Sequence, residues 1–523
     1  MIHSLEINDF RGFENKSIKL GKYITAISGK NGLGKSTILA LIGNACELKV
    51  ADGKTIFNSQ FGTKFGEIFK ASKEFDKSGS NKCKINFSLL TRPNEINDAK
   101  ICRVTWQRDR FRLIPESKGE TINSRKKEWP SIYLGLSRLY PIGEAKDEGV
   151  NIKDINLSNE ERAHFLENYV EILNLDVNDE IDVELINIDE TSRKKGVGVT
   201  TSQYSAITNS AGQDNIGQII LAILSFERLS KSKYSSYNGG LLLIDEIDAT
   251  LHPVAQIKLV KYLYKMCKQL KLQVIFTTHS VSLLEDICMK TIHNKDEETN
   301  NYEIVYLTKR NGPLEILRNP EFFVINNDLK ISNAYKSLKQ IPVYAEDAEG
   351  RWLFDNLLDR YKIYVNNIDI TLGCSQLLQL NKADPLYFSN VLFVLDGDVE
   401  DEDIKVSSTM KNVIKLPGDV RPEQVIYDFL IGLENDNEFW AFANRIGFNK
   451  EALKEHGPLS NDYEGKERDR YKKWFKNNLP IIDNLQVIKY WKESNCAEYK
   501  EFIKNFKNAY NEIAKRNFYP IIN

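Results

Sequence analysis

The fold of this 523-residue chain is decided by a glycine-rich stretch near its start, Gly29-Lys30-Asn31-Gly32-Leu33-Gly34-Lys35-Ser36-Thr37. It has the spacing G-x-x-x-x-G-K-[ST] of a phosphate-binding loop, or P-loop. The apolar run 23–28 before it predicts a strand, and the apolar run 36–46 after it predicts a helix. This context matters because the N–H groups of such a loop and of the following helix point at phosphate oxygens. The stretch therefore predicts an α/β protein that binds a nucleoside triphosphate.

Two side chains of the loop have particular parts in phosphate binding. Lys35 reaches the β- and γ-phosphates, and the hydroxyl of Ser36 is a ligand of Mg²⁺. We therefore expect ATP with Mg²⁺ as the cofactor. The residues expected to hold it are Gly29, Asn31, Gly32, Gly34, Lys35, Ser36 and Thr37.

Length and composition are those of a globular protein with more than one domain. A chain of 523 residues is too long for one core, and 41% apolar with 28% charged residues is ordinary. No apolar run approaches the ~20 residues of a membrane span, and residues 1–7 lack a signal-peptide pattern. We therefore expect a cytoplasmic protein without a membrane partner. With a net charge of −2, any nucleic-acid surface has to be local, as in the basic runs 124–127 and 466–476.

Two α/β regions are expected along the chain. Continuous apolar runs at 239–244 and 273–278 are typical of strands buried on both faces of a parallel sheet. A second strand–helix pattern begins with the apolar run 342–345. We therefore predict an ATPase domain over 1–335 and a second α/β domain with a C-terminal helical extension over 336–523.

The first domain is expected to carry a helical dimerisation insert over about 150–205. Within it, Ser158 followed by Glu161 three residues later has the pattern of a capping box, which predicts a helix that begins there.

A carboxylate pair follows the first of the buried strands. Leu241-Leu242-Leu243-Ile244 is followed directly by Asp245 and Glu246. Ligands of open α/β sheets bind at the carboxyl ends of the strands, which is where these two side chains would lie. We assign Asp245 to the shell of Mg²⁺ and Glu246 to the general base that activates the attacking water.

Three further features accompany this pair. Ser210-Ala211-Gly212-Gln213 precedes a long apolar helix, 247–253 follows Glu246, and His279 follows the second buried strand. Together with the P-loop they resemble the signature loop, Walker B motif, D-loop and switch histidine of the ATP-binding-cassette (ABC) ATPases.

In that family the signature serine of one subunit caps the γ-phosphate bound to the P-loop of the other. The resemblance therefore implies a homodimer or higher assembly, with Ser210 and Gly212 reaching the nucleotide of a second copy and His279 sensing the γ-phosphate. Gln60 is the candidate for the Q-loop glutamine.

A second acidic site is expected in the C-terminal domain. Glu346 ends a short apolar strand, and the apolar run 391–395 ends in Asp396-Gly397-Asp398. Clustered carboxylate oxygens are the ligands that hard divalent cations prefer, and phosphodiester cleavage uses such cations. We therefore assign Glu346, Asp396 and Asp398 to Mg²⁺, or to Mn²⁺ in its place. This layout resembles a TOPRIM domain.

An ABC-type head followed by a TOPRIM domain resembles the OLD nuclease family, which includes the nuclease of Gabija systems and retron-associated effectors. The resemblance implies a third catalytic carboxylate, for which Glu423 is the matching position, and a basic residue such as Lys472 or Lys473. One departure is that Asp347 stands where the family usually has glycine, with Glu349 nearby.

The preferred interpretation is an ATP-binding, metal-dependent DNA endonuclease that acts in antiviral defence under the control of nucleotide and of a protein or nucleic-acid partner. The defence role comes from the resemblance alone. Two alternatives remain open at this point. One is a RecF- or SMC-like DNA-binding ATPase without nuclease activity, and the other is an ATPase scaffold that traps a toxin partner.

Overall fold

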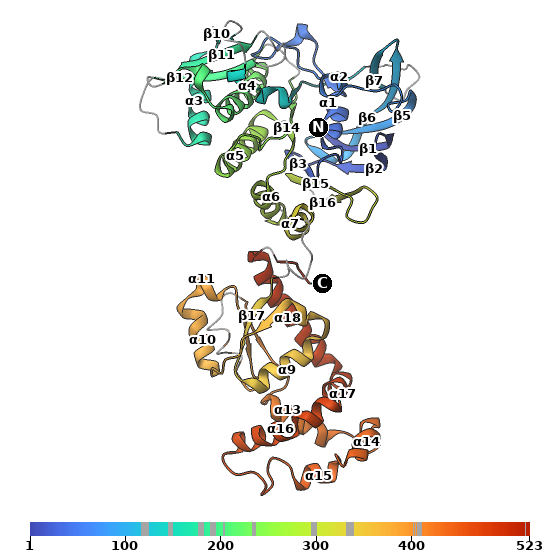
Figure 1. Ribbon diagram of the computed structural model, residues 1–523, viewed down its shortest axis with the longest axis vertical. Coiled ribbons are helices and arrows are strands. Elements are labelled where there is room, and N and C mark those ends of the chain that lie inside the picture. Colours follow the sequence, from blue (N-terminus) through green and yellow to red (C-terminus); the bar gives the residue numbers. More distant parts are fainter. Residues whose placement is uncertain are drawn as a thin grey trace. The chain divides into compact units, whose positions relative to one another are not determined.

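The computed structural model divides the chain into two compact units, 1–331 and 332–523 (Figure 1). The boundary expected at 335 lies outside the described residues. The described residues are 1–116, 125–144, 150–175, 182–188, 195–201, 204–232, 237–293, 301–330, 339–400, 402, 404, 411–517 and 519–522.

The first unit is built on a six-stranded mixed sheet with the order β16-β15-β3-β14-β13-β9. All neighbours in it are parallel except β15 and β16. Apolar residues occupy most of β13 and β14, which are buried along their whole length, so the two strands predicted from continuous apolar runs are confirmed. The strands are β3 (Ile24–Gly29), β9 (Ser131–Leu134), β13 (Gly240–Ile244), β14 (Leu272–Thr277), β15 (Tyr302–Thr308) and β16 (Glu315–Arg318).

Helices cover one face of this sheet, and a helix and a second sheet cover the other. One apolar core joins the sheet to α4, α5 and α6. On the other face α1 packs against a five-stranded antiparallel sheet, β2-β1-β5-β6-β7. The P-loop helix α1 thus packs between the two sheets. The elements are α1 (Lys35–Gly43), α4 (Ala211–Lys231), α5 (Pro253–Leu270), α6 (Val281–His293), β1 (Ile2–Phe10), β2 (Phe13–Lys19), β5 (Gly79–Leu89), β6 (Arg92–Gln107) and β7 (Arg110–Glu116).

The segment expected as a helical insert, 150–205, is mainly a sheet in its described part. Strands β10 (Val150–Asp154), β11 (Asp182–Ile188) and β12 (Lys195–Thr200) form an antiparallel sheet beside α3 (Asn159–Leu173). The prediction of a helical insert is therefore wrong for the strands. The physical reason is a sequence period of two, since the buried Val197 and Val199 alternate with Gly196 and Gly198, where an added Cβ would lie 3.1 Å from Ile186 and 2.4 Å from Ala206.

The one helix of this segment begins where the capping box predicted. Ser158 accepts a hydrogen bond from the N–H of Glu161 at 3.2 Å, and the Glu161 carboxylate accepts one from the N–H of Ser158 at 2.9 Å. Both groups satisfy donors that the first turn leaves without helical partners.

The second unit is a four-stranded parallel sheet with the order β18-β17-β19-β20, surrounded by helices. Its core joins the sheet to α9 and to the C-terminal helices, in agreement with the predicted helical extension. The elements are β17 (Ile341–Ala345), α9 (Ala348–Leu358), β18 (Val365–Asn367), α10 (Cys374–Ala383), β19 (Leu392–Leu395), β20 (Val413–Lys415), α13 (Pro422–Gly432), α14 (Glu438–Ala443), α15 (Lys450–Glu455), α16 (Glu467–Asn484), α17 (Val487–Ser494) and α18 (Cys496–Asn517).

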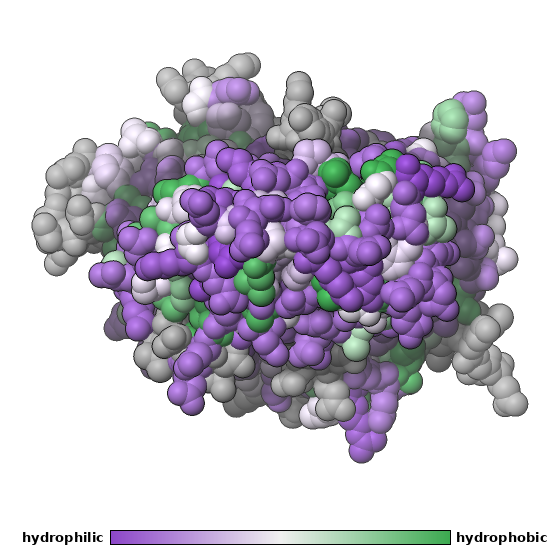
Figure 2. All heavy atoms as spheres, turned by 90° about the horizontal axis from the view of Figure 1, so that it is seen from below, coloured by the Kyte–Doolittle hydropathy of each residue, from purple (hydrophilic) through white to green (hydrophobic). Residues whose placement is uncertain are grey.

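Hydrophilic residues dominate the face of the molecule drawn in Figure 2, where hydrophobic residues appear singly or in small groups. Among the described helices, none is both long and apolar enough to cross a membrane.

Candidate functional site

The P-loop joins β3 to α1, and two of its glycines are required by the fold. Gly29 has a φ of 139°, and an added Cβ would lie 2.3 Å from the carbonyl oxygen of Leu307. Gly34 has a φ of 93°, and an added Cβ would lie 2.5 Å from the ring of Phe13. A side chain at either position would both clash and strain the backbone. The neighbouring strand and β2 therefore shape the loop.

Lys35 lies over the loop that it belongs to. Its ammonium donates hydrogen bonds to the carbonyl oxygens of Gly29, at 2.9 Å, and Lys30, at 3.1 Å. Burial lowers the pKa of Lys35, and the carboxylates of Glu246 and Asp245 oppose that shift. The lysine is thus held at the loop by backbone carbonyls, within the electrostatic range of the Walker B carboxylates.

Ser36 and Asp245, both assigned to Mg²⁺ from the sequence, lie in contact. The Ser36 hydroxyl donates to Asp245 at 3.2 Å, and the hydroxyl of Thr277 donates to the same carboxylate oxygen at 2.6 Å. Asp245 is buried at the carboxyl end of β13. A hydroxyl beside a buried carboxylate is a donor set of hard oxygens, which fits Mg²⁺ bound with nucleotide phosphates.

Glu246 is held by its backbone in a left-handed conformation, with a φ of 49°. Its N–H donates to the Thr277 hydroxyl at 2.7 Å, and its carbonyl accepts from Arg138 at 2.8 Å. Non-glycine residues adopt this conformation at an energetic cost, so the surrounding contacts have to hold it. Two hydrogen bonds fix the backbone, and the carboxylate forms none of the hydrogen bonds found within the described residues.

Arg138 is a residue that the sequence reasoning missed. Its guanidinium is buried and donates to the side chain of Asn215 at 2.9 Å as well as to Glu246, so it ties α4 to the Walker B turn. Burial lowers its pKa to about 10, which leaves it charged at neutral pH. A lone arginine shortly after the apolar run 131–136 was the available signal.

His279 follows β14 and half faces solvent. Its backbone N–H donates to the carboxylate of Asp248 at 3.3 Å. Burial and the charge of Lys35 lower the pKa of the imidazole. At neutral pH the ring is therefore neutral and can accept or donate one hydrogen bond. The imidazole that is expected to sense the γ-phosphate therefore lies within the electrostatic range of the P-loop lysine.

The expected signature loop caps α4. Ser210 accepts from the N–H of Gln213 at 3.3 Å, and its own N–H donates to the Gln213 side chain at 2.8 Å. An added Cβ at Gly212 would lie 2.6 Å from the carbonyl oxygen of Thr250, so the loop packs on the turn after Glu246. Ser210 is exposed. Within the described residues of one copy, no hydrogen bond joins Ser210 to the P-loop.

Gln60 is not brought to the P-loop by any hydrogen bond among the described residues. Its amide donates to the carbonyl of Leu48 at 3.0 Å. It lines a hollow of about 370 Å³ that Tyr133 also lines. The hydroxyl of Tyr133 lies 3.5 Å from Asp245, so this hollow adjoins the Walker B carboxylate.

The second acidic site lies at the carboxyl ends of β17 and β19. The N–H of Asp396 donates to one oxygen of Glu346 at 2.9 Å, and the N–H of Cys374 donates to the other at 3.2 Å. Burial raises the pKa of Asp396 to about 8, and the nearby charge of Glu346 adds to that shift. Burial also raises the pKa of Glu346. The structure thus brings Glu346 and Asp396 together.

Glu423 adds a third carboxylate, which is buried in the first turn of α13. It is 1% exposed, and neither of its carboxylate oxygens has a hydrogen-bond partner among the described residues. One oxygen of Asp396 likewise has none. Burial raises the pKa of Glu423. Buried carboxylates that lack donors are costly unless a cation accompanies them.

Asp398 is less closely associated with this acidic site than Glu346, Asp396 and Glu423 are. It is exposed and forms an ion pair with Arg421 at 3.2 Å. In the described part of the chain, no group of three or more His, Cys, Asp or Glu side chains is arranged to hold a metal ion as it stands. The carboxylates of Glu346, Asp396 and Glu423 nevertheless fit a divalent cation, because they offer hard oxygen donors and those of Asp396 and Glu423 include buried oxygens without a hydrogen-bond partner among the described residues.

Asp347, the departure from the family pattern, has a defined structural role. It caps α9 by accepting from the N–H of Gly350 at 3.0 Å, and its other oxygen accepts a hydrogen bond from Lys472. Although burial acts to raise the pKa of Asp347, the Lys472 ammonium and the Gly350 N–H hold it below its usual range. Of the two expected basic candidates, Lys472 therefore faces the acidic site, whereas Lys473 donates to the carbonyl of Glu464.

Two lysines of the basic run 124–127 are engaged within the protein. Lys126 forms an ion pair with Glu47 at 3.1 Å, and Lys127 forms one with Asp98 at 2.6 Å. Ser124 lies outside the described residues. These pairs leave little free charge on 125–127 for a nucleic acid.

Comparisons with known proteins agree with the nucleotide site. Residues 116–284 match the family model described as an AAA ATPase domain. This span contains Ser210, Asp245, Glu246 and His279 and begins after the P-loop. The match supports nucleotide binding and ATP hydrolysis.

One curated relative is the Septu protein PtuA of Bacillus mycoides (strain KBAB4), 27% identical over 304 residues. The similarity covers 53% of this chain and 38% of the relative, so the chain spans about two fifths of that protein.

Two solved structures that are similar to this chain are SMC heads. The SMC head domain from Thermotoga maritima has a TM-score of 0.32 at 15% identity and covers 60% of this chain and 98% of that one. The SmcHead bound to the C-winged helix domain of ScpA has a TM-score of 0.36 at 17% identity, with 61% and 97% covered.

Proposed function

We propose that this protein is an ATP-regulated, metal-dependent DNA endonuclease of the OLD type that acts in antiviral defence. The ATPase part rests on the P-loop, the Walker B contacts and the AAA ATPase match. The nuclease part rests on the acidic site of the second unit. The defence role, with a partner protein or nucleic acid, follows from the resemblance to the OLD family.

One observation carries the nuclease proposal. Asp396 and Glu346 end neighbouring parallel strands and are joined by a 2.9 Å hydrogen bond, and the buried Glu423 has no donor for either oxygen. The strand order β18-β17-β19-β20 brings these strand ends to one sheet edge. Two of these acids, Asp396 and Glu423, keep buried oxygens without a hydrogen-bond donor among the described residues, which supports a cation site rather than a structural ion pair.

A cation held by Glu346, Asp396 and Glu423 would activate a water and neutralise charge on the scissile phosphate. The chain's own groups prepare for this. Two backbone N–H groups fix both oxygens of Glu346, and burial of Asp396 excludes bulk water. Lys472 holds its positive charge beside Asp347 at the same edge, where it would stabilise an anionic phosphate.

The ATP site is proposed to close between two copies of the chain. Lys35, Ser36 and Asp245 would hold the nucleotide and Mg²⁺ in one copy, while the exposed Ser210 and Gly212 of the second copy would cap the γ-phosphate. Glu246 would orient the attacking water, with His279 beside the γ-phosphate. Nucleotide state would thereby govern the nuclease unit through dimerisation.

A cleavage assay tests the nuclease proposal directly. The full chain is incubated with supercoiled plasmid DNA and Mg²⁺ or Mn²⁺, with and without ATP. We expect nicked or linear products from the wild type and a loss of at least about 1000-fold for Asp396→Asn, because a ligand of the cation is removed. The matched control is Asp436→Asn, which neutralises an exposed aspartate in the same unit and is expected to cleave normally.

A second candidate function is an ATPase that binds DNA or a partner without cutting. It is favoured by the ion pairs of Asp347 with Lys472 and of Asp398 with Arg421, which neutralise two of the acids. If the wild type cleaves neither DNA nor RNA under any of these conditions while hydrolysing ATP, this candidate replaces the first.

A further inference from the structure

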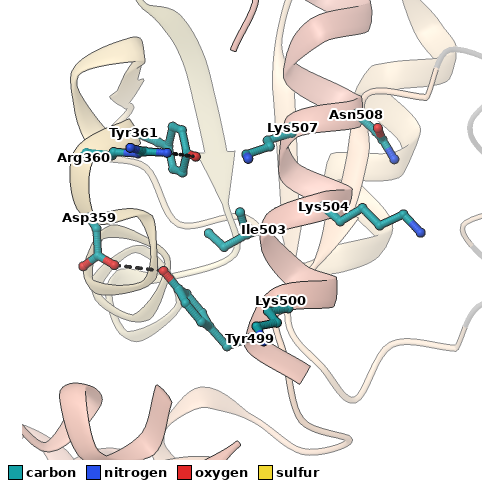
Figure 3. Close-up of a pocket in the computed structure, with 9 residues that line it drawn as sticks. All are labelled: Asp359, Arg360, Tyr361, Tyr499, Lys500, Ile503, Lys504, Lys507 and Asn508. Atoms are coloured by element: carbon teal, nitrogen blue, oxygen red, sulfur yellow. Dashed lines mark hydrogen bonds between the residues drawn. The ribbon is translucent and has the colours of Figure 1, made fainter. Parts of the chain in front are cut away.

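A basic hollow lies on the second unit, between the 3₁₀ helix 359–364 and α18 (Figure 3). Its volume is about 530 Å³. Four cationic side chains line it, Arg360, Lys500, Lys504 and Lys507, against one carboxylate, Asp359. This excess of positive charge occurs in a protein whose net charge is −2.

The one carboxylate that lines the hollow is already paired with other side chains of the protein. Asp359 forms an ion pair with Lys492 at 2.7 Å, and its other oxygen accepts from the hydroxyl of Tyr499 at 2.8 Å. In the described part of the chain, Lys500, Lys504 and Lys507 form no ion pair with a carboxylate. Their charge is therefore available to an anionic ligand.

The three lysines belong to one helix, α18. Positions 500, 504 and 507 recur at helical spacing, so their backbone atoms span roughly 10 Å along the helix axis. That length corresponds to the axial rise of about three nucleotides in one strand of a duplex. The opposite side of α18 is apolar, with Phe502 and Phe506 buried in the core. The helix therefore holds the three lysines on a fixed support.

The far wall of the hollow reinforces its positive potential. Arg360 donates to the hydroxyl of Tyr361 at 3.0 Å, and the Lys507 ammonium lies 5.1 Å from the centre of the same ring. In Figure 3, Lys507 points across the hollow toward Tyr361, while Lys504 projects outward on the other side of the helix. The hydrogen bonds of Arg360 and Lys507 lower the pKa of Tyr361.

We propose that Arg360, Lys500, Lys504 and Lys507 bind the phosphate backbone of a nucleic-acid strand, apart from the acidic site. Phosphate is favoured over an acidic peptide because three of the cations recur along one helix beside an open hollow and the fourth, Arg360, lines its facing wall, which suits a continuous charged backbone. The inference rests on the proposed function for the strand's purpose, which is to hold the substrate of the nuclease. Binding itself is measured without cleavage.

The test is a salt titration of binding. Full-length protein in EDTA is titrated with a fluorescein-labelled single-stranded DNA 20-mer, and Kd is measured by anisotropy at several NaCl concentrations. For the variant Lys500→Gln, Lys504→Gln, Lys507→Gln we expect Kd to rise about tenfold or more, and the slope of log K against log[salt] to fall by about 2. Replacing the same lysines by arginine is expected to keep both values.

A matched triple variant controls for net charge. Lys382→Gln, Lys454→Gln, Lys489→Gln removes the same charge from exposed lysines elsewhere in the unit and is expected to bind as the wild type does. If the triple variant fails to fold, the single variants Lys500→Gln and Lys504→Gln give the same test at exposed positions.

Two results would overturn the inference. One is a wild-type protein that binds no DNA in EDTA, and the other is an unchanged Kd and salt slope in the variants. The proposed nuclease fails separately, because Asp396→Asn is expected to lose cleavage and keep DNA binding.

Discussion

Asp396 is buried in surroundings that disfavour its charged form. It is 2% exposed, one of its oxygens has no hydrogen-bond partner among the described residues, and the charges of Glu346 and Asp347 lie nearby. Burial and this repulsion favour the protonated form in the folded state. The same features that make the residue a good cation ligand therefore make it costly in the metal-free protein.

The disfavoured charge of Asp396 predicts that the stability of the metal-free protein depends on pH. The pKa of Asp396 rises from 3.8 to about 8 on folding, so its neutral form is favoured in the folded state. The contribution of Asp396 to stability is thus greatest at low pH and falls as the pH rises from about 4 to about 8, by at most about 1.4 kcal/mol per pH unit. We expect Asp396→Asn to reduce this decline when thermal unfolding midpoints in EDTA are compared at pH 5.5 and 8. Equal pH dependence in both proteins would contradict the assignment.

At the scale of single elements, α3 and α4 begin with the same device. Ser158 and Ser210 each form a capping box, with Glu161 and Gln213. Replacing either serine by alanine removes a hydrogen bond to the first turn and costs about 1 kcal/mol. Only Ser210 stands at the proposed nucleotide interface.

The two caps therefore form a matched pair of variants. We expect Ser158→Ala and Ser210→Ala to lower the unfolding midpoint by similar amounts, while only Ser210→Ala lowers the ATP hydrolysis rate, by about tenfold or more. Steady-state hydrolysis and thermal unfolding of both proteins check this. If both variants hydrolyse ATP at the wild-type rate, Ser210 acts only as a helix cap.

Some of these structural features could be predicted from the sequence, and others could not. The P-loop, the buried strands β13 and β14 and the cap at Ser158 depend on neighbours within a few residues, so local pattern was sufficient. The contact of Lys472 with Asp347 joins residues 125 positions apart and has no local signal. Arg138 was missed for the same reason, since its partners come from three separate segments.

The prediction that failed concerns the sheet of β10, β11 and β12, which was expected to be helical. Segment 175–205 mixes polar residues with glycine, and its period of two is short. Its strands gain stability from pairing with one another and from packing on α4, which no single segment reveals.

At the scale of the whole molecule, the second unit has its own core. The sheet of this unit and its helices α13 to α18 share one apolar cluster drawn from residues 341–522. A fragment 336–523 is therefore expected to fold alone and unfold cooperatively in urea. Circular dichroism with a urea titration measures this. A non-cooperative transition would show that the first unit is needed for its stability.

Two variants of the ATPase unit separate the nucleotide states that the account connects to cleavage. Lys35→Ala removes the ammonium that would contact the phosphates and is expected to stay free of ATP. Glu246→Gln removes the proposed base and is expected to bind ATP while hydrolysing it at least about 100-fold more slowly. Both leave the acidic site of the second unit unchanged.

The most direct test is the single-turnover rate of plasmid cleavage by these two variants, with saturating ATP and Mn²⁺ and with Asp396→Asn as the blank. The account predicts that both cleave above the blank and that their rates differ by at least about tenfold, because one is trapped with ATP and the other is without it. Equal rates, or no cleavage above the blank by either variant, would contradict a nuclease governed by its ATPase unit.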